Sequence, residues 1–294
     1  MILVAGATGV LGMEIVRRLA ERRQPVRALV RESSNPDKVR SLRNLGAEIA
    51  RGDLKEGSTL QSACRGVDAV ISTVTAITTA KPGDSFADTD AGGNINLVDA
   101  SAASGTRQFI FVSFDTDGAV DAPLSRAKRS AEEHIRRSGM THTILQPSLF
   151  MESWLGPMLF ADVPNATAKV YGSGNVGIEY IAVADVAETV VQSVTSEAAG
   201  NATIRFGGPE AISQRRAVEI FSEELGKPFS VVEVPQGDLE RQWSSAEDPF
   251  QKSFAALMLA VARGFGGGMS PASTRFPMRM TTVREFAKQQ ATRS

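Results

Sequence analysis

The sequence predicts an α/β protein in which a doubly wound parallel sheet is followed by a smaller α+β lobe. Short, almost continuously apolar runs alternate with helical patterns in the first half, which is typical of parallel strands covered on both faces. After Gln146-Pro147 the pattern changes to large apolar residues and glycine-rich turns. We expect a sheet domain over residues 1–150 and a smaller lobe over 151–294, with segments near 178–206 packing back on the sheet domain.

The expected strands of the sheet are short and apolar. They lie at residues 2–5, 26–30, 47–50, 69–74, 108–113 and 142–146. Between the first two, Ile15, Val16 and Leu19 recur at helical spacing, with charged residues on the opposite face. Because crossovers between parallel strands are right-handed, helices should cover both faces of the sheet.

The second half of the chain predicts a mixture of strands and helices. A strand is expected at 178–183, and a helical pattern follows it directly. Another helix should begin after Ser213, a favoured capping residue, and end at Gly226. A long helical pattern around 254–262 leads into the glycine-rich segment 264–271, which could act as a lid.

The composition argues against several classes of protein. The 294 residues carry a formal net charge of -1, so no overall basic surface for nucleic acid is indicated. One cysteine and two histidines argue against disulfides and against cysteine- or histidine-rich metal sites. No run approaches the roughly 20 apolar residues of a membrane span, and no signal peptide is visible. We expect a cytoplasmic monomer or homodimer with no metal, membrane or nucleic-acid partner.

The segment "GATGVLG" predicts a dinucleotide-binding turn. Gly6, Gly9 and Gly12 lie between the first expected strand and the first expected helix. Such glycines allow a sharp bend, close approach of a phosphate and tight packing of helix on strand. The amino end of the helix then offers N–H groups and partial positive charge to a pyrophosphate. The spacing differs from the commoner Gly-x-Gly-x-x-Gly, and the alternative is a structural turn that binds nothing.

Arg31, at the end of the second expected strand, favours NADP(H) over NAD(H). An NAD site places an acidic residue there for the ribose 2′-hydroxyl, whereas an arginine suits the 2′-phosphate of NADP. Glu32 beside it could indicate the opposite preference, and Arg31 could be an ordinary surface residue. Asp53, after the third strand, either accepts from an adenine amino group or caps the next turn.

Five segments together resemble the NmrA-like, isoflavone-reductase-like branch of the atypical short-chain dehydrogenases. They are "GATGVLG", "VRALVRE", "GDL", "RQFIFVSF" and "THTILQPSLFMES", in order from residue 1 to about 153. The resemblance implies a Rossmann domain that binds NADP(H), with a small carboxyl-terminal lobe closing over the nicotinamide. One departure is Gln146-Pro147, where many relatives have Arg-Pro.

The resemblance also implies which residues contact the cofactor. The pyrophosphate would lie against Gly6, Thr8, Gly9, Val10, Leu11 and Gly12, the 2′-phosphate against Arg31, and the adenine against Asp53 and Leu54. Thr73, Val74 and Thr75 would lie along the cofactor, with Pro147, Ser148, Leu149 and Phe150 beside the nicotinamide.

The catalytic apparatus expected of ordinary short-chain dehydrogenases is incomplete. They use Tyr-x-x-x-Lys on one face of a helix, where the lysine holds the nicotinamide ribose and the tyrosine moves a proton. Here Leu124 stands at the tyrosine position and Lys128 at the lysine position. Lys128 either holds the ribose and orients the substrate or is an exposed lysine of a charged helix. Ser113 corresponds to the serine that assists the tyrosine, and without that tyrosine it could simply line the site.

The missing tyrosine favours an acceptor that needs little acid catalysis. A quinone is strongly electrophilic, and water can protonate its product oxygens. We therefore expect an NADP(H)-dependent oxidoreductase that transfers hydride to a small apolar acceptor such as a quinone, with Phe150 and Trp154 in the substrate pocket. The alternative is a non-catalytic NADP(H)-binding redox sensor of the NmrA type, with a regulatory protein partner.

Overall fold

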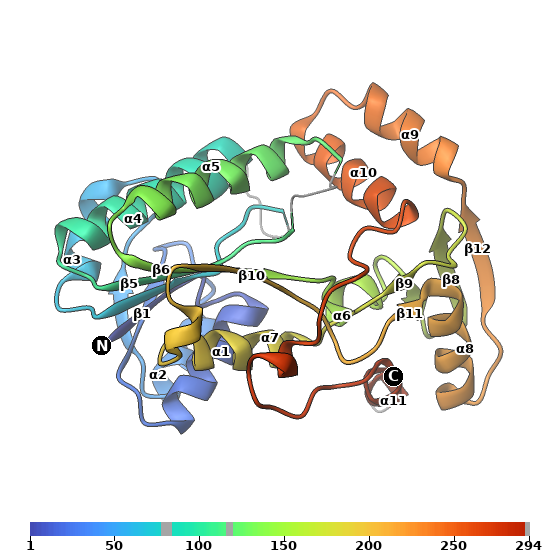
Figure 1. Cartoon of the computed structure of the whole chain (residues 1–294), viewed down its shortest axis with the longest axis horizontal. Helices are drawn as coiled ribbons and strands as arrows, with labels where there is room; N and C mark the ends of the chain where they lie inside the picture. Colours follow the sequence, from blue (N-terminus) through green and yellow to red (C-terminus); the bar gives the residue numbers. More distant parts are fainter. Residues whose placement is uncertain (78–83, 116–119, 292–294) are drawn as a thin grey trace. The chain divides into compact units, whose positions relative to one another are not determined.

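The computed structural model describes residues 1–77, 84–115 and 120–291 (Figure 1). A seven-stranded sheet has the order β10-β6-β5-β4-β1-β2-β3, and the pairings from β3 to β6 are parallel. Its strands are β1 (Ile2–Ala5), β2 (Val26–Val30), β3 (Glu48–Arg51), β4 (Ala69–Ser72), β5 (Gln108–Val112), β6 (Thr141–Pro147) and β10 (Ala202–Phe206). The predicted α/β fold is confirmed.

Helices cover both faces of this sheet. In Figure 1, α3, α4 and α5 lie on one side of the sheet, and α1, α2 and α7 lie on the other. Their bounds are α1 (Val10–Glu21), α2 (Pro36–Asn44), α3 (Gly57–Cys64), α4 (Asn94–Ala103), α5 (Pro123–Arg137) and α7 (Val183–Ser193), and a π-helical segment, η1 (Ala87–Gly93), leads into α4. The core includes Leu3, Val70 and Phe109, and burying each such side chain contributes about 1.5–3 kcal/mol.

The strand order reverses beside β1. Ala5 at the end of β1 lies opposite Leu29 of β2 on one side and Ser72 of β4 on the other. In open parallel sheets, ligands bind outside the carboxyl ends of the strands at such a reversal. The segments that follow β1, β2 and β4 are therefore where this fold places a binding site.

The chain forms two compact units. The first comprises Met1–Phe114, Pro123–Gln146 and Val186–Ile204, and the second comprises Asp115–Ala122, Pro147–Asp185 and Arg205–Ser294. The segment Val186–Ile204 thus belongs to the unit that contains the large sheet. The division into domains at residue 150 stays a prediction.

The second unit contains two small sheets and five helices within the described residues. Its strands are β7 (Ala161–Asp162), β8 (Thr167–Tyr171), β9 (Gly177–Ile178), β11 (Ile212–Ser213) and β12 (Ser230–Val234), and its helices are α6 (Met151–Trp154), α8 (Gln214–Leu225), α9 (Gln236–Ser245), α10 (Pro249–Ala262) and α11 (Val283–Ala291). The Phe221 ring packs 5.8 Å from the Phe160 ring, between centroids. The predicted limits of α8 are confirmed: Ser213 Oγ accepts from the Arg216 N–H at 3.1 Å, and Gly226 ends the helix with φ of 64°.

The strand predicted at 178–183 is wrong for most of its length. Only Gly177–Ile178 forms a strand, and Ile181 makes a single bridge to Phe150. Tyr180 contributes to the apolar pattern of this segment, but its side chain packs in the core of the second unit, with 2% of its surface exposed. A short apolar run indicates that the side chains are buried, but buried residues need not form the backbone hydrogen bonds of a β-sheet.

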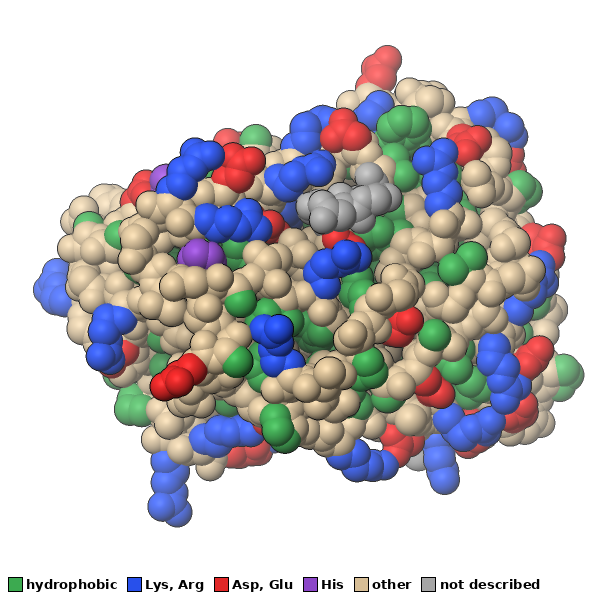
Figure 2. Space-filling model, in the orientation of Figure 1, with side chains coloured by type: hydrophobic (Ala, Val, Ile, Leu, Met, Phe, Trp, Pro, Cys, Tyr) green, Lys and Arg blue, Asp and Glu red, His purple; other side chains and the backbone are tan. Residues whose placement is uncertain are grey.

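Two surface properties bear on partners. Within the described part of the chain, no helix is long and apolar enough to cross a membrane. On the face drawn in Figure 2, lysine and arginine side chains lie among aspartate and glutamate side chains.

The Glu188 carboxylate of α7 links this helix to α1. It pairs with Arg18 at 2.7 Å and with Arg22 at 2.6 Å. Desolvation raises the pKa of Glu188, but hydrogen bonds from Gln192, Arg22 and Arg18 outweigh it, so the pKa lies below its ordinary value. A lowered folded-state pKa stabilises the protein above the unfolded pKa, and this stabilisation is lost as pH falls through the folded pKa.

We therefore expect Glu188→Gln to lower the free energy of unfolding by roughly 1 kcal/mol at pH 7. The difference between the two proteins should begin to shrink as the pH falls below the unfolded pKa of about 4.3, and it should vanish below the folded pKa of Glu188, where the wild-type carboxyl is protonated and uncharged. Urea unfolding at pH 7 and pH 3.5 measures this difference. An equal deficit at both pH values would contradict the ion-pair explanation.

Candidate functional site

The turn after β1 leaves no room for a side chain at Gly6 or Gly12. Gly6 has φ of 80°, a conformation that favours glycine. A Cβ atom at Gly12 would lie 2.2 Å from the Gly6 carbonyl oxygen, and the Gly9 N–H donates to that same oxygen at 2.9 Å. Strand and helix therefore approach through glycine backbone, as the fit of a pyrophosphate requires.

The amino end of α1 is open to an anion. Gly9 is the residue before the helix, no side chain caps the first turn, and that turn contains no acidic residue. Val10, the first helical residue, has 70% of its surface exposed. Uncapped N–H groups and the helix dipole together favour a negatively charged ligand at this position.

Two cations lie near the end of β2 and the glycine turn. Arg31 has 34% of its side chain exposed, and its Nη1 lies 3.7 Å from Asp84 Oδ2. Lys38, in the first turn of α2, donates from Nζ to the Thr8 carbonyl oxygen of the glycine turn at 2.9 Å. The carboxylate of Glu32 is largely exposed and lies 3.7 Å from Arg51. Two cations suit a phosphate better than a ribose hydroxyl. Lys38 is not among the residues predicted from the sequence, because its contact with Thr8 forms only in the folded chain.

Asp53 and Leu54 have structural partners after β3. Asp53 Oδ1 accepts from the Lys55 N–H at 3.0 Å, which is the turn-capping alternative. Leu54 is 8% exposed and belongs to the core of the first unit. The contact of both residues with adenine stays a prediction.

The segment after β4 lies against the glycine turn. Thr73 Oγ1 donates to the Ala5 carbonyl oxygen at 3.2 Å, and a Cβ atom at Gly6 would meet this hydroxyl at 2.5 Å. Thr73, Val74 and Thr75 are each half-buried. The structure thus brings the predicted cofactor residues of β1 and β4 together at one edge of the sheet.

Lys128 is a buried residue, so the alternative of an exposed surface lysine is wrong. It is 4% exposed, and its Nζ lies 3.1 Å from Asp90 Oδ1 and donates to the Val74 carbonyl oxygen at 3.0 Å. The ammonium also lies 4.9 Å from the centre of the Phe111 ring, within the range of a cation–π interaction. Asp90 was missed because nothing in its local sequence marks it as the partner of a lysine 38 positions later.

The other predicted catalytic position is buried as well. The Ser113 side-chain hydroxyl has no hydrogen-bond partner among the described residues, and its backbone N–H donates to the Leu145 carbonyl oxygen at 2.8 Å. Leu124, at the tyrosine position, is 4% exposed. Buried hydroxyl groups normally have a partner, so the Ser113 hydroxyl is an exception, and its role in the site stays a prediction.

Gln146 has its own buried partner on α5. Its Nε2 donates to Glu132 Oε1 at 2.9 Å, and the same carboxylate pairs with Arg136 at 3.0 Å. This chain thus places a neutral amide against a buried carboxylate at this position.

The remaining predicted residues all lie in the second unit, and Pro147, the last residue of β6, is where the chain enters that unit. The Ser148 N–H donates to the Phe206 carbonyl oxygen, and its Oγ donates to the Gly266 carbonyl oxygen at 2.9 Å. Leu149 and Trp154 contribute to the core of this unit, the latter as a partly buried residue. The roles of Pro147, Ser148, Leu149 and Phe150 beside the nicotinamide stay predictions.

The glycine-rich segment 264–271 is held by hydrogen bonds within the second unit. Glu179, which is 9% exposed, accepts from the Gly268 and Met269 N–H groups at 3.2 and 3.3 Å. Gly207 donates to the Ser270 carbonyl oxygen at 2.9 Å. Three glycines of this segment have positive φ, which its path requires.

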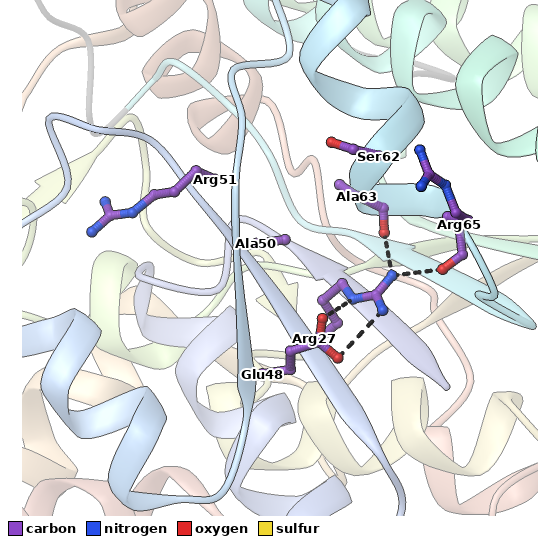
Figure 3. A pocket seen from close by; sticks show the side chains of 7 residues that line it. All are labelled: Arg27, Glu48, Ala50, Arg51, Ser62, Ala63 and Arg65. Carbon is purple, nitrogen blue, oxygen red and sulfur yellow. Dashed lines mark hydrogen bonds and ion pairs between the residues drawn. The ribbon is translucent and has the colours of Figure 1, made fainter.

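A hollow elsewhere on the first unit has a structural explanation. It is lined by Arg27, Glu48, Ala50, Arg51, Ser62, Ala63 and Arg65. Figure 3 shows the Arg27 guanidinium between the Glu48 carboxylate and the carbonyl oxygens of Ala63 and Arg65. This arginine caps the end of α3 and lies at the amino ends of the strands. Within the described ranges, no group of three or more potential ligand side chains could hold a metal ion.

Comparisons with known proteins agree with this architecture. The NAD(P)H azoreductase of Xenophilus azovorans is 31% identical over 239 residues, which cover 80% of this chain and 77% of that protein. The photosystem II assembly factor Ycf39 of a Synechocystis species is 27% identical over 98% of this chain and 90% of its own.

The solved structure of the Escherichia coli NADPH-dependent quinone oxidoreductase QOR2 complexed with NADPH has the same fold. Its TM-score is 0.80 at 20% identity, over 99% of both chains. The model of the NmrA-like family matches residues 1–287. The chain therefore belongs to the NmrA-like family, as its motifs predicted.

Proposed function

We propose that this protein is an NADP(H)-dependent oxidoreductase that transfers hydride to a small apolar acceptor such as a quinone. The observation that carries the proposal is the presence, in one unit, of a tight glycine turn that Lys38 contacts, of Arg31 at the end of β2, and of the buried Lys128. When bound, NADPH supplies the hydride.

The glycine turn and the amino end of α1 would hold the pyrophosphate, because the first turn of the helix offers N–H groups that no side chain caps. Arg31 and Lys38 would hold the 2′-phosphate through charge-assisted hydrogen bonds. We assign the adenine to Asp53 and Leu54, and the middle of the cofactor to residues 73–75. The nicotinamide is assigned to residues 147–150.

Lys128 and Ser113 are assigned to oxygen atoms of the cofactor ribose or the acceptor. The ammonium donates hydrogen bonds, and the Ser113 hydroxyl has no partner among the described residues. Leu124 supplies no proton, so the one proton that the reduced quinone takes up after hydride transfer comes from water. Phe150 and Trp154 are assigned to the apolar acceptor.

Two of the similar proteins support a redox reaction by their names, the azoreductase and the NADPH-dependent quinone oxidoreductase. Azo compounds and quinones are both electron-poor, conjugated and largely apolar acceptors. An acceptor of this kind needs hydride and orientation more than strong acid catalysis.

The test is oxidation of NADPH at 340 nm by purified protein with benzoquinone, naphthoquinone and menadione. Acceptor-dependent oxidation that is saturable in both substrates is expected. Binding of NADPH without turnover of any quinone or azo acceptor would contradict the proposed activity.

Arg31→Ala should weaken NADPH binding roughly ten- to a hundredfold, because a hydrogen bond to a charged group contributes about 1.5–3 kcal/mol. NADH, which lacks the 2′-phosphate, should bind wild type and variant within about threefold of each other by the same reasoning. Nicotinamide fluorescence titration measures both affinities. Equal losses for the two cofactors would show that Arg31 does not read the phosphate.

A second candidate function is a cofactor-dependent assembly or regulatory protein. The buried Leu124 at the tyrosine position and the similarity to an assembly factor over 98% of the chain favour it. It predicts binding of NADP(H) without turnover, and different affinities for the oxidised and reduced forms.

A further inference from the structure

Asp90 connects three parts of the first unit around Lys128. Its side chain is fully buried in η1. Oδ1 lies 3.1 Å from Lys128 Nζ on α5, and Oδ2 accepts from the Ala76 N–H at 2.9 Å in the segment after β4. Both carboxylate oxygens thus face groups outside η1.

Lys128 contacts both Asp90 and the segment after β4. Its one described hydrogen bond runs to the Val74 carbonyl oxygen, so residues 74–76 are tied to Lys128 at one end and to Asp90 at the other. An ammonium carries three N–H donors. Its contact with Asp90 Oδ1 is an ion pair outside hydrogen-bond alignment, which leaves donor capacity for a ligand.

A second anchor fixes η1 itself. Asn94 Nδ2 donates to the Asp90 carbonyl oxygen at 2.9 Å, and Ser72 Oγ donates to Asn94 Oδ1 at 2.6 Å. The backbone at Asp90 is therefore linked through Asn94 to Ser72 at the end of β4. The carboxylate itself is positioned by the Ala76 N–H and the Lys128 ammonium.

A buried Asp–Lys ion pair adds little to the free energy of unfolding compared with apolar residues in its place. Removing two charges from water costs several kcal/mol per ion, and well-packed apolar residues often do as well or better. Nearby charges already have other partners: Glu132 pairs with Arg136, Asp88 bonds with Ser85, and Asp99 pairs with His134. Asp90 alone, among the described residues, balances the Lys128 charge.

We propose that Asp90 is a positioning residue of the active site, which holds the Lys128 ammonium and the segment 74–76 in the arrangement that presents the lysine to its ligand. This inference rests on the proposed function and extends it. Asp90 touches neither cofactor nor acceptor and acts through Lys128.

The experiment is a double-mutant cycle with Asp90→Asn, Lys128→Met and the double variant. Asparagine keeps an oxygen for the Ala76 N–H but removes the charge. Asp90→Asn should lower kcat at least about tenfold at saturating NADPH and quinone, with the quinone KM changed less than about threefold. The double variant should lose no more kcat than Lys128→Met, because residues acting as one unit are not additive.

The matched control is Asp88→Asn, the same substitution on an exposed side chain in the same π-helical segment. It should keep wild-type kcat. Additive losses in the double variant, or wild-type kcat in folded Asp90→Asn, would overturn the inference. If Asp90→Asn does not fold, Asp90→Glu replaces it; its kcat should fall between those of wild type and the double variant, and a wild-type value again overturns the inference.

Measuring the affinity for NADPH distinguishes a failure of this inference from a failure of the proposed activity. If wild type turns over no acceptor, the proposed activity fails, and the same cycle is measured as NADPH dissociation constants. Coupling between positions 90 and 128 in binding supports the positioning role, whereas independent effects overturn it.

Discussion

Gly12→Ala is expected to abolish measurable NADPH binding and to destabilise the protein. The new Cβ would lie 2.2 Å from the Gly6 carbonyl oxygen and 2.8 Å from Ala7 Cα, so backbone rather than a flexible side chain must move. Overpacking of this kind costs about 1–3 kcal/mol, although alanine alone would favour the helix by about 1 kcal/mol. Thermal unfolding and cofactor titration measure the two effects.

The matched control is Gly57→Ala at the first residue of α3. A Cβ atom there meets nothing within 4 Å, and Gly57 does not have positive φ. This variant should keep wild-type cofactor affinity and equal or higher stability. If Gly12→Ala behaved like Gly57→Ala, the tight approach of strand and helix at the glycine turn would be refuted.

Lys128→Met is expected to cost about 3–5 kcal/mol of unfolding free energy, because it leaves the Asp90 carboxylate buried without its cation. It should also lower kcat strongly, since the donor assigned to the ligand is gone. Chemical denaturation measures the first effect, and NADPH oxidation measures the second.

Lys252→Met is a suitable comparison for Lys128→Met. Lys252 donates to a backbone carbonyl oxygen, that of Ala246, and lies 5.8 Å from the Trp243 ring centre, but no described carboxylate pairs with it. Its replacement should cost less than about 1 kcal/mol, because a single partly exposed hydrogen bond contributes little. Equal losses in the two variants would argue against a special role for the Asp90–Lys128 pair.

Much of the fold follows from local patterns. The apolar runs at 2–5 and 26–30 became β1 and β2 because parallel strands buried on both faces need nearly continuous apolar residues. Ser213 and Gly226 marked the ends of α8 because capping and positive φ are local requirements. The strand predicted around Tyr180 is wrong, because this residue is buried by side-chain packing in the second unit and not by strand pairing in a sheet.

The candidate site was only partly predictable for the same reason. Gly12, Arg31 and Lys128 stand at fixed offsets from strands and helices, so their positions could be read from spacing. Asp90 and Lys38 act through contacts with residues 38 and 30 positions away, at Lys128 and Thr8, and only the folded chain brings these together. Asp53 shows the converse case, where a motif residue has a local capping role.

The most direct test of the account is calorimetric titration of the wild-type protein with NADPH and NADH, side by side. The carboxyl edge of the sheet, with its open glycine turn and two cations, predicts one site per chain and NADPH binding at least about tenfold tighter than NADH. Binding of neither cofactor, or equal binding of both, would contradict the assignment of this edge as an NADP(H) site.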